Sequence, residues 1–158
     1  MLSCDALFIS DLHLGSNQCE ASHLAAFLEC IRPRQLFLVG DIIDLQAIRF
    51  NANVDADFLT DLIDALLARE DEDPLTSETL LRSQLLRASH RRVLERFEAL
   101  HRAGVAIVYI PGNHDAYLRR HAGLERPGFA IRRQDVYCTP SGQRLLVRHG
   151  DEYDRLIR

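Results

Sequence analysis

The chain has 158 residues, 47% of them hydrophobic, which is enough to bury one substantial core. Its formal net charge of −4 argues against nucleic acid bound through net charge alone. No apolar stretch approaches the roughly 20 residues that cross a bilayer, so we expect no transmembrane segment and a cytoplasmic protein.

The first two predicted strands each lead into acidic residues. Residues 6–10 form a short apolar run that stops at Asp11. Apolar residues at helical spacing follow over 24–31, and Pro33 is expected to end that helix. The run QLFLVGDIIDL, which starts at residue 35, predicts the second strand. A strand, a helix and a strand in this order predict an α/β sheet, in which functional groups gather at the carboxyl ends of the strands.

A helical insertion is predicted between the second and third strands. Residues 56–69 place their apolar side chains on one helical face, and a second helical segment runs from about Glu78 to Arg102. We treat 56–102 as an insertion within a single domain, 1–158. It either packs on the sheet or caps the cleft. Its arginine-rich face is either solvated or a surface for anionic head groups, which would give a peripheral membrane contact.

The third predicted strand, in VAIVYIPGNHD, is apolar throughout and should be covered on both faces. It ends in polar residues at a glycine turn, with Asn113 and His114. Two weaker strands are predicted around Val136–Cys138 and Leu145–Arg148, and the second runs directly into HGDEYD. All of these strands fit one α/β domain.

Four predicted strand ends carry the same kinds of polar side chain. They are Asp11 with His13, Asp41 with Asp44, Asn113 with His114 and Asp115, and His149 with Asp151. Carboxylate, imidazole and amide oxygen form a mixed nitrogen and oxygen ligand set, suited to ions such as Mn, Fe or Zn. Without a cation these carboxylates would form an anionic pocket that repels phosphate, whereas two divalent ions would reverse its sign.

In this order, the motifs DLH, GDIID, GNHD and HGD resemble those of the calcineurin-like metallophosphoesterase superfamily. The nearest resemblance is to the UDP-2,3-diacylglucosamine hydrolase group, in the branch with His in the third motif. The resemblance implies an α/β fold in which a β-sandwich is flanked by helices. The GHxH motif of the superfamily does not occur in this sequence, so we expect a C-terminally incomplete fold with a helical insertion.

The resemblance also implies a role for each motif residue. The implied metal ligands are Asp11 and His13 for one ion, Asn113 and His149 for the other, and Asp41 as the bridge between them. His114 occupies the place of the catalytic histidine, which stabilises or protonates the leaving group, and Asp115 would orient it through the other ring nitrogen. Asp44 and Asp151 would support the ligands from behind. The implied cofactor is a pair of divalent metal ions, with Mn expected and Fe, Zn, Ni or Mg as alternatives.

The implied activity is hydrolysis of a phosphoester or pyrophosphate bond, like that of a UDP-2,3-diacylglucosamine hydrolase in lipid A biosynthesis. The substrate would then be a nucleotide-linked sugar lipid, and the protein would be peripheral to the inner membrane. One alternative is a broad-specificity nucleotide phosphodiesterase. Another is a non-catalytic relative that uses the fold as a scaffold for partner binding. The sequence makes no prediction of the oligomeric state.

Overall fold

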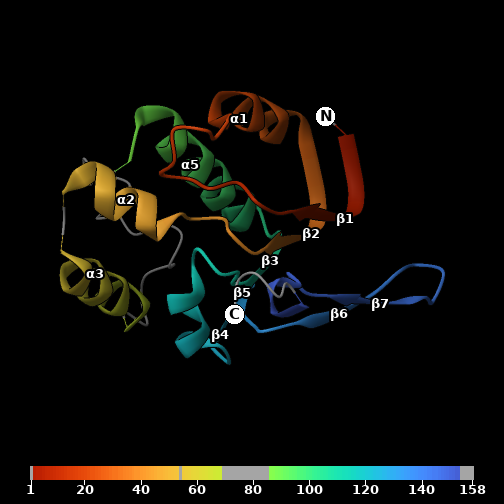
Figure 1. Cartoon of the computed structure of the whole chain (residues 1–158). Helices are drawn as coiled ribbons and strands as arrows, with labels where there is room; N and C mark the ends of the chain where they lie inside the picture. Colours follow the sequence, from red (N-terminus) through yellow and green to blue (C-terminus); the bar gives the residue numbers. More distant parts are fainter. Residues whose placement is uncertain (1, 54, 69–85, 154–158) are drawn as a thin grey trace.

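The computed structural model describes residues 2–53, 55–68 and 86–153 and has a mixed α/β architecture (Figure 1). Its strands are β1 (Leu2–Ile9), β2 (Ile31–Val39), β3 (Ala106–Ile110), β4 (Glu125–Arg126), β5 (Phe129–Ile131), β6 (Asp135–Cys138) and β7 (Arg144–Val147). Its α-helices are α1 (Ala21–Cys30), α2 (Leu45–Ala52), α3 (Ala56–Ala68) and α5 (Ala88–Arg102). Two 3₁₀ helices complete the described elements, η1 (Ala116–His121) and η2 (Asp151–Tyr153).

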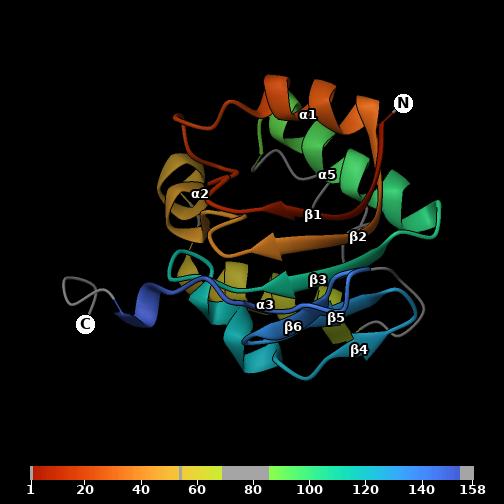
Figure 2. The ribbon, with the colours of Figure 1, turned by 90° about the vertical axis from the view of Figure 1, so that its right-hand side faces the viewer.

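The central sheet has five strands in the order β1-β2-β3-β5-β4. Neighbouring strands from β1 to β5 are parallel, and β4 pairs antiparallel with β5. Figure 2 shows the arrowheads of β1, β2 and β3 pointing to the same side. The loops that follow these strands therefore lie at one edge of the sheet, which is where α/β proteins place their functional groups.

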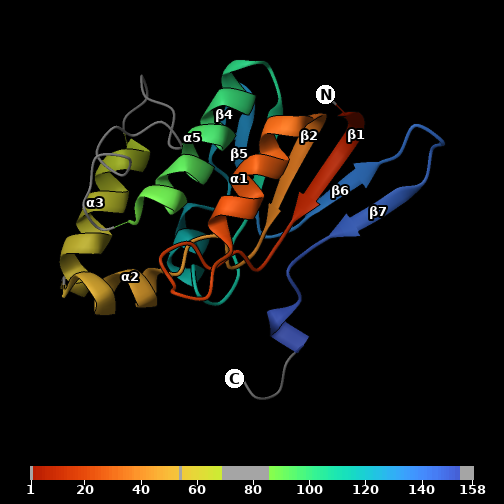
Figure 3. The ribbon, with the colours of Figure 1, turned by 90° about the horizontal axis from the view of Figure 1, so that it is seen from above.

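Helices cover one face of the central sheet, and a hairpin covers the other (Figure 3). On the helical face α1 packs against α5, and their buried Leu28 and Phe97 share a core with Leu36 of β2. On the opposite face β6 and β7 form a second, two-stranded sheet, whose Val147 shares a smaller core with Phe37. The predicted α/β fold is therefore confirmed, with helices and a second sheet on opposite faces.

The segment predicted as an insertion, 56–102, contains two helices in the described part of the chain. The predicted helix at 56–69 agrees with α3, whereas α5 begins at Ala88, later than the predicted start near Glu78. Residues 69–85 lie outside the described residues. Fully buried Val93 and Phe97 hold α5 on the sheet, where it forms the crossover that connects parallel β2 and β3. This helix therefore belongs to the body of the domain.

Some local predictions differ from the structure. Helix α1 ends at Cys30 and Pro33 lies inside β2, so the prediction that Pro33 ends the helix was wrong. Pro33 pairs with Cys4 of β1, and the pairing of β2 with β3 begins only at Gln35. At Pro33, β2 is therefore paired with β1 only. The missing N–H of the proline removes no hydrogen bond from the pairing of β2 with β3. Elements α2, β4 and β5 were not predicted, because such short elements contain little periodicity.

Candidate metal centre

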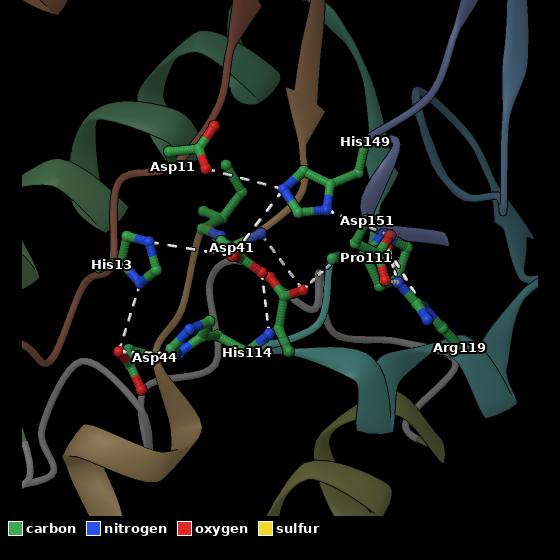
Figure 4. A network of polar contacts seen from close by, with 12 residues as sticks. Asp11, His13, Asp41, Asp44, Pro111, His114, Arg119, His149 and Asp151 are labelled. Carbon is green, nitrogen blue, oxygen red and sulfur yellow. Dashed lines mark hydrogen bonds and ion pairs between the residues drawn. The ribbon is translucent and has the colours of Figure 1, made fainter. Parts of the chain in front are cut away.

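The candidate site lies on the loops that follow β1, β2, β3 and β7 (Figure 4). The first two loops continue the pairing of their strands, since the Asp11 N–H donates to the Gly40 carbonyl over 3.1 Å. The His13 N–H donates to the Asp41 carbonyl over 2.8 Å. The Gly40 N–H in turn donates to the carbonyl of Ile110 in β3 over 2.6 Å. These backbone hydrogen bonds fix the positions of the loops relative to one another, independently of any side-chain contact.

Three candidate ligands have an uncommon backbone conformation. Asp11, His13 and Asp41 have φ angles of 54°, 48° and 53°, in the left-handed region that residues other than glycine rarely occupy. The only other described non-glycine residue in this region is Asn53, which caps the end of α2. Such strain persists where the surrounding structure enforces it, and it concentrates at functional sites. The conformation turns all three side chains out of the strand direction.

Asp41 lies at the centre of the site. Its side chain is almost fully buried, and its Oδ1 accepts a hydrogen bond of 2.9 Å from the His114 backbone N–H. Its Oδ2 lies 3.9 Å from Nε2 of His13 and 3.8 Å from Nε2 of His149. One carboxylate oxygen is therefore held by the backbone, and the other faces an imidazole on each side (Figure 4).

Two groups of candidate ligands share Asp41. One consists of Asp11, Asp41 and His149, and the other of His13, Asp41 and His114, with the ligand atoms of each group within 4.8 Å of one another. The resemblance implied a different division, with Asp11 beside His13, whereas the structure places Asp11 Oδ1 3.7 Å from Nε2 of His149. The implied fifth ligand, Asn113, is half-buried on the loop that also carries His114.

Two glycines allow this close approach. A Cβ atom on Gly40 would lie 2.2 Å from the His149 ring, and one on Gly112 would lie 2.2 Å from Oδ1 of Asp41. Both distances are far below the 3.5–4.0 Å of an ordinary carbon contact. The glycines at these strand ends therefore make room for the central carboxylate and for His149.

Asp44 supports both histidines of the second group. Its Oδ2 lies 3.3 Å from Nδ1 of His13 and 3.1 Å from Nδ1 of His114, while its Oδ1 accepts the Ala47 N–H at the start of α2 over 2.8 Å. Burial opposes the charged form of Asp44, yet the Ala47 N–H and the two imidazoles outweigh it and hold the pKa of this carboxyl below its ordinary value. One side chain thus caps α2 and orients the two rings.

Asp115 takes a different place from the one expected. It is fully buried and accepts the Tyr109 hydroxyl over 2.6 Å, together with the backbone N–H groups of Ile42 over 2.9 Å and Gly112 over 2.5 Å. The expectation that Asp115 orients the His114 ring was wrong, because its oxygens are occupied by these donors behind the site. Burial raises the pKa of the Asp115 carboxyl even though the donors oppose that change. Its role in the structure is to tie the loop after β3 to the loop after β2.

Asp151 lies beside His149, as expected, and is joined by an arginine that the sequence reading did not single out. Its Oδ1 lies 3.3 Å from Nδ1 of His149, and its Oδ2 accepts a hydrogen bond of 2.6 Å from Arg119 (Figure 4). Burial opposes the charged form of Asp151, but Arg119 and His149 outweigh it and hold the pKa of the carboxyl below its ordinary value. Tyr109 and Arg119 were both missed, since Tyr109 lies within an apolar strand and Arg119 lies outside the four strand-end motifs.

The donor set fits divalent metal ions. Carboxylate oxygens and imidazole nitrogens suit Mn, Fe and Zn, and a carboxylate behind an imidazole is the usual support of a metal-binding histidine. The Nδ1 of His114 is buried and lies 3.1 Å from Oδ2 of Asp44, although it makes no hydrogen bond with a described residue. Ion binding beside Asp41 would also relieve the repulsion between neighbouring carboxylates.

None of the helices in the described part of the chain is both long enough and apolar enough to cross a membrane.

Comparison with known proteins connects this site to a family. The family model described as calcineurin-like phosphoesterase matches residues 6–157. A protein of Aeromonas salmonicida named UDP-2,3-diacylglucosamine hydrolase is 29% identical over 148 residues, which cover 92% of this chain and 44% of that protein. A protein with the same name from Cellvibrio japonicus is 26% identical, over 94% of this chain and 48% of that protein. Another from Proteus mirabilis is 28% identical, over 92% of this chain and 47% of that protein. The chain therefore spans about half the length of the curated relatives it matches.

Proposed function

Because this chain belongs to the calcineurin-like phosphoesterase family, we propose that it is a metal-dependent hydrolase of phosphoester or pyrophosphate bonds. The observation that carries the proposal is the position of Asp41. This buried carboxylate belongs to both groups of candidate ligands, and its Oδ2 faces a histidine of each. A carboxylate shared between two sets of donors can bridge two ions that lie a few Å apart.

We assign one divalent ion to each group, with Mn as the preferred ion and Fe, Zn, Ni or Mg as alternatives. Asp11 and His149 would bind one ion and His13 the other, with Asp41 shared, and Asn113 stays a predicted ligand. When bound, such ions polarise a phosphoryl group and activate water for attack. The contribution of the protein is to hold these donors rigidly and to orient the imidazole rings through the carboxylates beside them.

His114 has two candidate uses. We propose the role that the family resemblance implied, in which His114 donates a proton to the leaving group or stabilises it. The side chain beside its ring is Asp44 in place of the expected Asp115. The place of His114 beside His13 and Asp41 supports ligation as the alternative. His114→Asn separates the two uses. Loss of turnover with unchanged Mn affinity would assign proton transfer, and loss of both would assign ligation.

For the substrate, we propose a nucleotide-linked acylated sugar cleaved at its pyrophosphate, in lipid A biosynthesis at the cytoplasmic face of the inner membrane. The names of the relatives support this choice. So do two exposed aromatic side chains on the helices that follow Asp44 in the chain: Phe50 of α2 is 87% exposed and Phe58 of α3 is 54% exposed. Turnover of a UDP-linked acylated sugar should exceed that of a short nucleotide diester. Equal rates would favour the broad-specificity phosphodiesterase.

The direct test is hydrolysis of bis(p-nitrophenyl) phosphate with added Mn. Native protein should be active, and Asp41→Ala should lose activity by at least a hundredfold, because one side chain serves both groups. Asp61→Ala, on the exposed side of α3, removes the same charge away from the site and should retain full activity. Activity that survives Asp41→Ala would refute the two-ion assignment. Mn binding without turnover of any phosphodiester would favour the scaffold.

A further inference from the structure

A pocket of about 470 Å³ lies next to the candidate metal centre. Its lining includes Pro111 after β3, Arg119 of η1, Arg133 before β6, and His149 and Asp151 after β7. His149 also belongs to the group formed with Asp11 and Asp41, so one wall of the pocket is the metal centre itself. The volume lies within the roughly 300–1,000 Å³ of sites that bind small molecules.

The pocket is rich in guanidinium groups. Three arginines line it, Arg119, Arg133 and Arg148, against two carboxylates, Asp151 and Glu152, which leaves one positive charge. Both carboxylates are already engaged, Asp151 by Arg119 and Glu152 by Arg148. Arg119 and Arg148 are therefore each paired with an acidic neighbour, and Arg133 is the lining arginine that the described carboxylates leave unpaired.

Two arginines have donors to spare. Arg133 is exposed and forms no ion pair with any described residue. Arg148 binds Glu152 and the Tyr153 hydroxyl through its terminal nitrogens, but its Nε is buried and has no hydrogen-bond partner in the described structure. A buried donor without a hydrogen-bond partner carries a free-energy cost. Guanidinium groups bind phosphate through paired N–H donors, so these side chains suit a phosphoryl oxygen.

We propose that this pocket, called here the arginine pocket, binds a second phosphoryl group of the substrate next to the one that is cleaved. The inference rests on the proposed hydrolase function and narrows it to substrates that carry two neighbouring phosphoryl groups. One phosphoryl group would lie at the ions that Asp41 is proposed to share, and the other would contact Arg133 and Arg148. A diester with a single phosphorus gains nothing from the arginine pocket.

The test compares UDP-glucose, which has two phosphoryl groups, with bis(p-nitrophenyl) phosphate, which has one. Arg133→Gln should raise KM for UDP-glucose about tenfold while kcat/KM for bis(p-nitrophenyl) phosphate stays within twofold of native. Arg144→Gln makes the same change at an exposed residue of β7 outside the pocket and should alter neither substrate. An equal effect of Arg133→Gln on both substrates, or no effect on either, would overturn the proposal.

Failure of the proposed function would look different. If native protein with Mn hydrolyses neither substrate, the hydrolase proposal fails, and binding of UDP-glucose measured by calorimetry decides the fate of the arginine pocket. Affinity about tenfold weaker in Arg133→Gln than in Arg144→Gln would support the pocket without the chemistry. Equal affinities, or no binding by the native chain, would overturn it.

Discussion

Replacing Gly112 by alanine should damage the candidate metal centre without touching a ligand. The added Cβ would lie 2.2 Å from Oδ1 of Asp41, 2.7 Å from the Asp41 backbone N and 2.8 Å from the His149 ring. Each distance is about 1 Å or more shorter than an ordinary contact. Asp41 is buried and held by its neighbours, so the overlap can be relieved only by moving the carboxylate or the loop.

The expected size of the effect follows from overpacking. Extra atoms in a well-packed interior cost about 1–3 kcal/mol, and 1 kcal/mol lowers Tm by about 2–4 °C in a domain of this size. Gly112→Ala should therefore lower Tm by roughly 2–12 °C. Because the displaced atoms are candidate ligands, Mn affinity should fall at least tenfold.

The assay is thermal unfolding with and without Mn, combined with calorimetric titration of Mn. Gly142→Ala is the control, since a Cβ there meets nothing within 4 Å and only the positive φ of 84° opposes the change. This control should lose some stability and retain native Mn affinity. A folded Gly112→Ala protein that binds Mn as tightly as the native chain would show that Asp41 and His149 do not hold the ion.

Further predictions concern three other side chains. Asp44→Asn keeps an oxygen that can cap α2, so stability should be nearly unchanged while activity falls. Asp44→Ala removes the cap and should lower the free energy of unfolding by about 1 kcal/mol in urea. Equal stability of the two variants would contradict the capping role. The pKa of Asp64 is held below its ordinary value, and the hydrogen bond from Tyr117 is the largest cause. The charged carboxylate should therefore stabilise the fold above the unfolded-state pKa of about 3.9. This stabilisation should be lost as pH falls through the lower pKa of the folded state. The difference in unfolding free energy between native protein and Asp64→Asn should therefore shrink below about pH 4. A difference that stays constant with pH, or the same trend in Asp61→Asn, would contradict this role of Asp64. Tyr109→Phe removes a donor from a buried carboxyl and should cost about 1–3 kcal/mol in denaturant unfolding; unchanged stability would show that the bond matters little.

The sequence predicted where functional groups gather because the fold class alone determines it. Parallel strands bring their carboxyl ends to one edge, so the acidic and histidine motifs after β1, β2 and β3 had to approach each other. The long, strongly periodic helix α3 was predicted for a similar reason, since its apolar face repeats over several turns. Features that depend on strand order or on hydrophobic periodicity could therefore be predicted from the sequence.

The grouping of the candidate ligands could not be predicted from the sequence, because it depends on side-chain directions. Positive φ angles at Asp11, His13 and Asp41 redirect three side chains, and no pattern of residue types predicts those angles. The burial of Asp115 behind the site depends on Tyr109, which in the sequence is one more apolar position of a strand. Such details arise from packing between distant segments, and the sequence records them only indirectly.

The central claim is that Asp41 is shared by two divalent ions. Calorimetric titration of the metal-free chain with Mn tests it most directly, with the bound metal counted by elemental analysis. The account predicts two ions bound per native chain and weak or no uptake by Asp41→Ala, with native uptake by Asp61→Ala. No uptake by the native chain, or uptake that Asp41→Ala leaves unchanged, would contradict it.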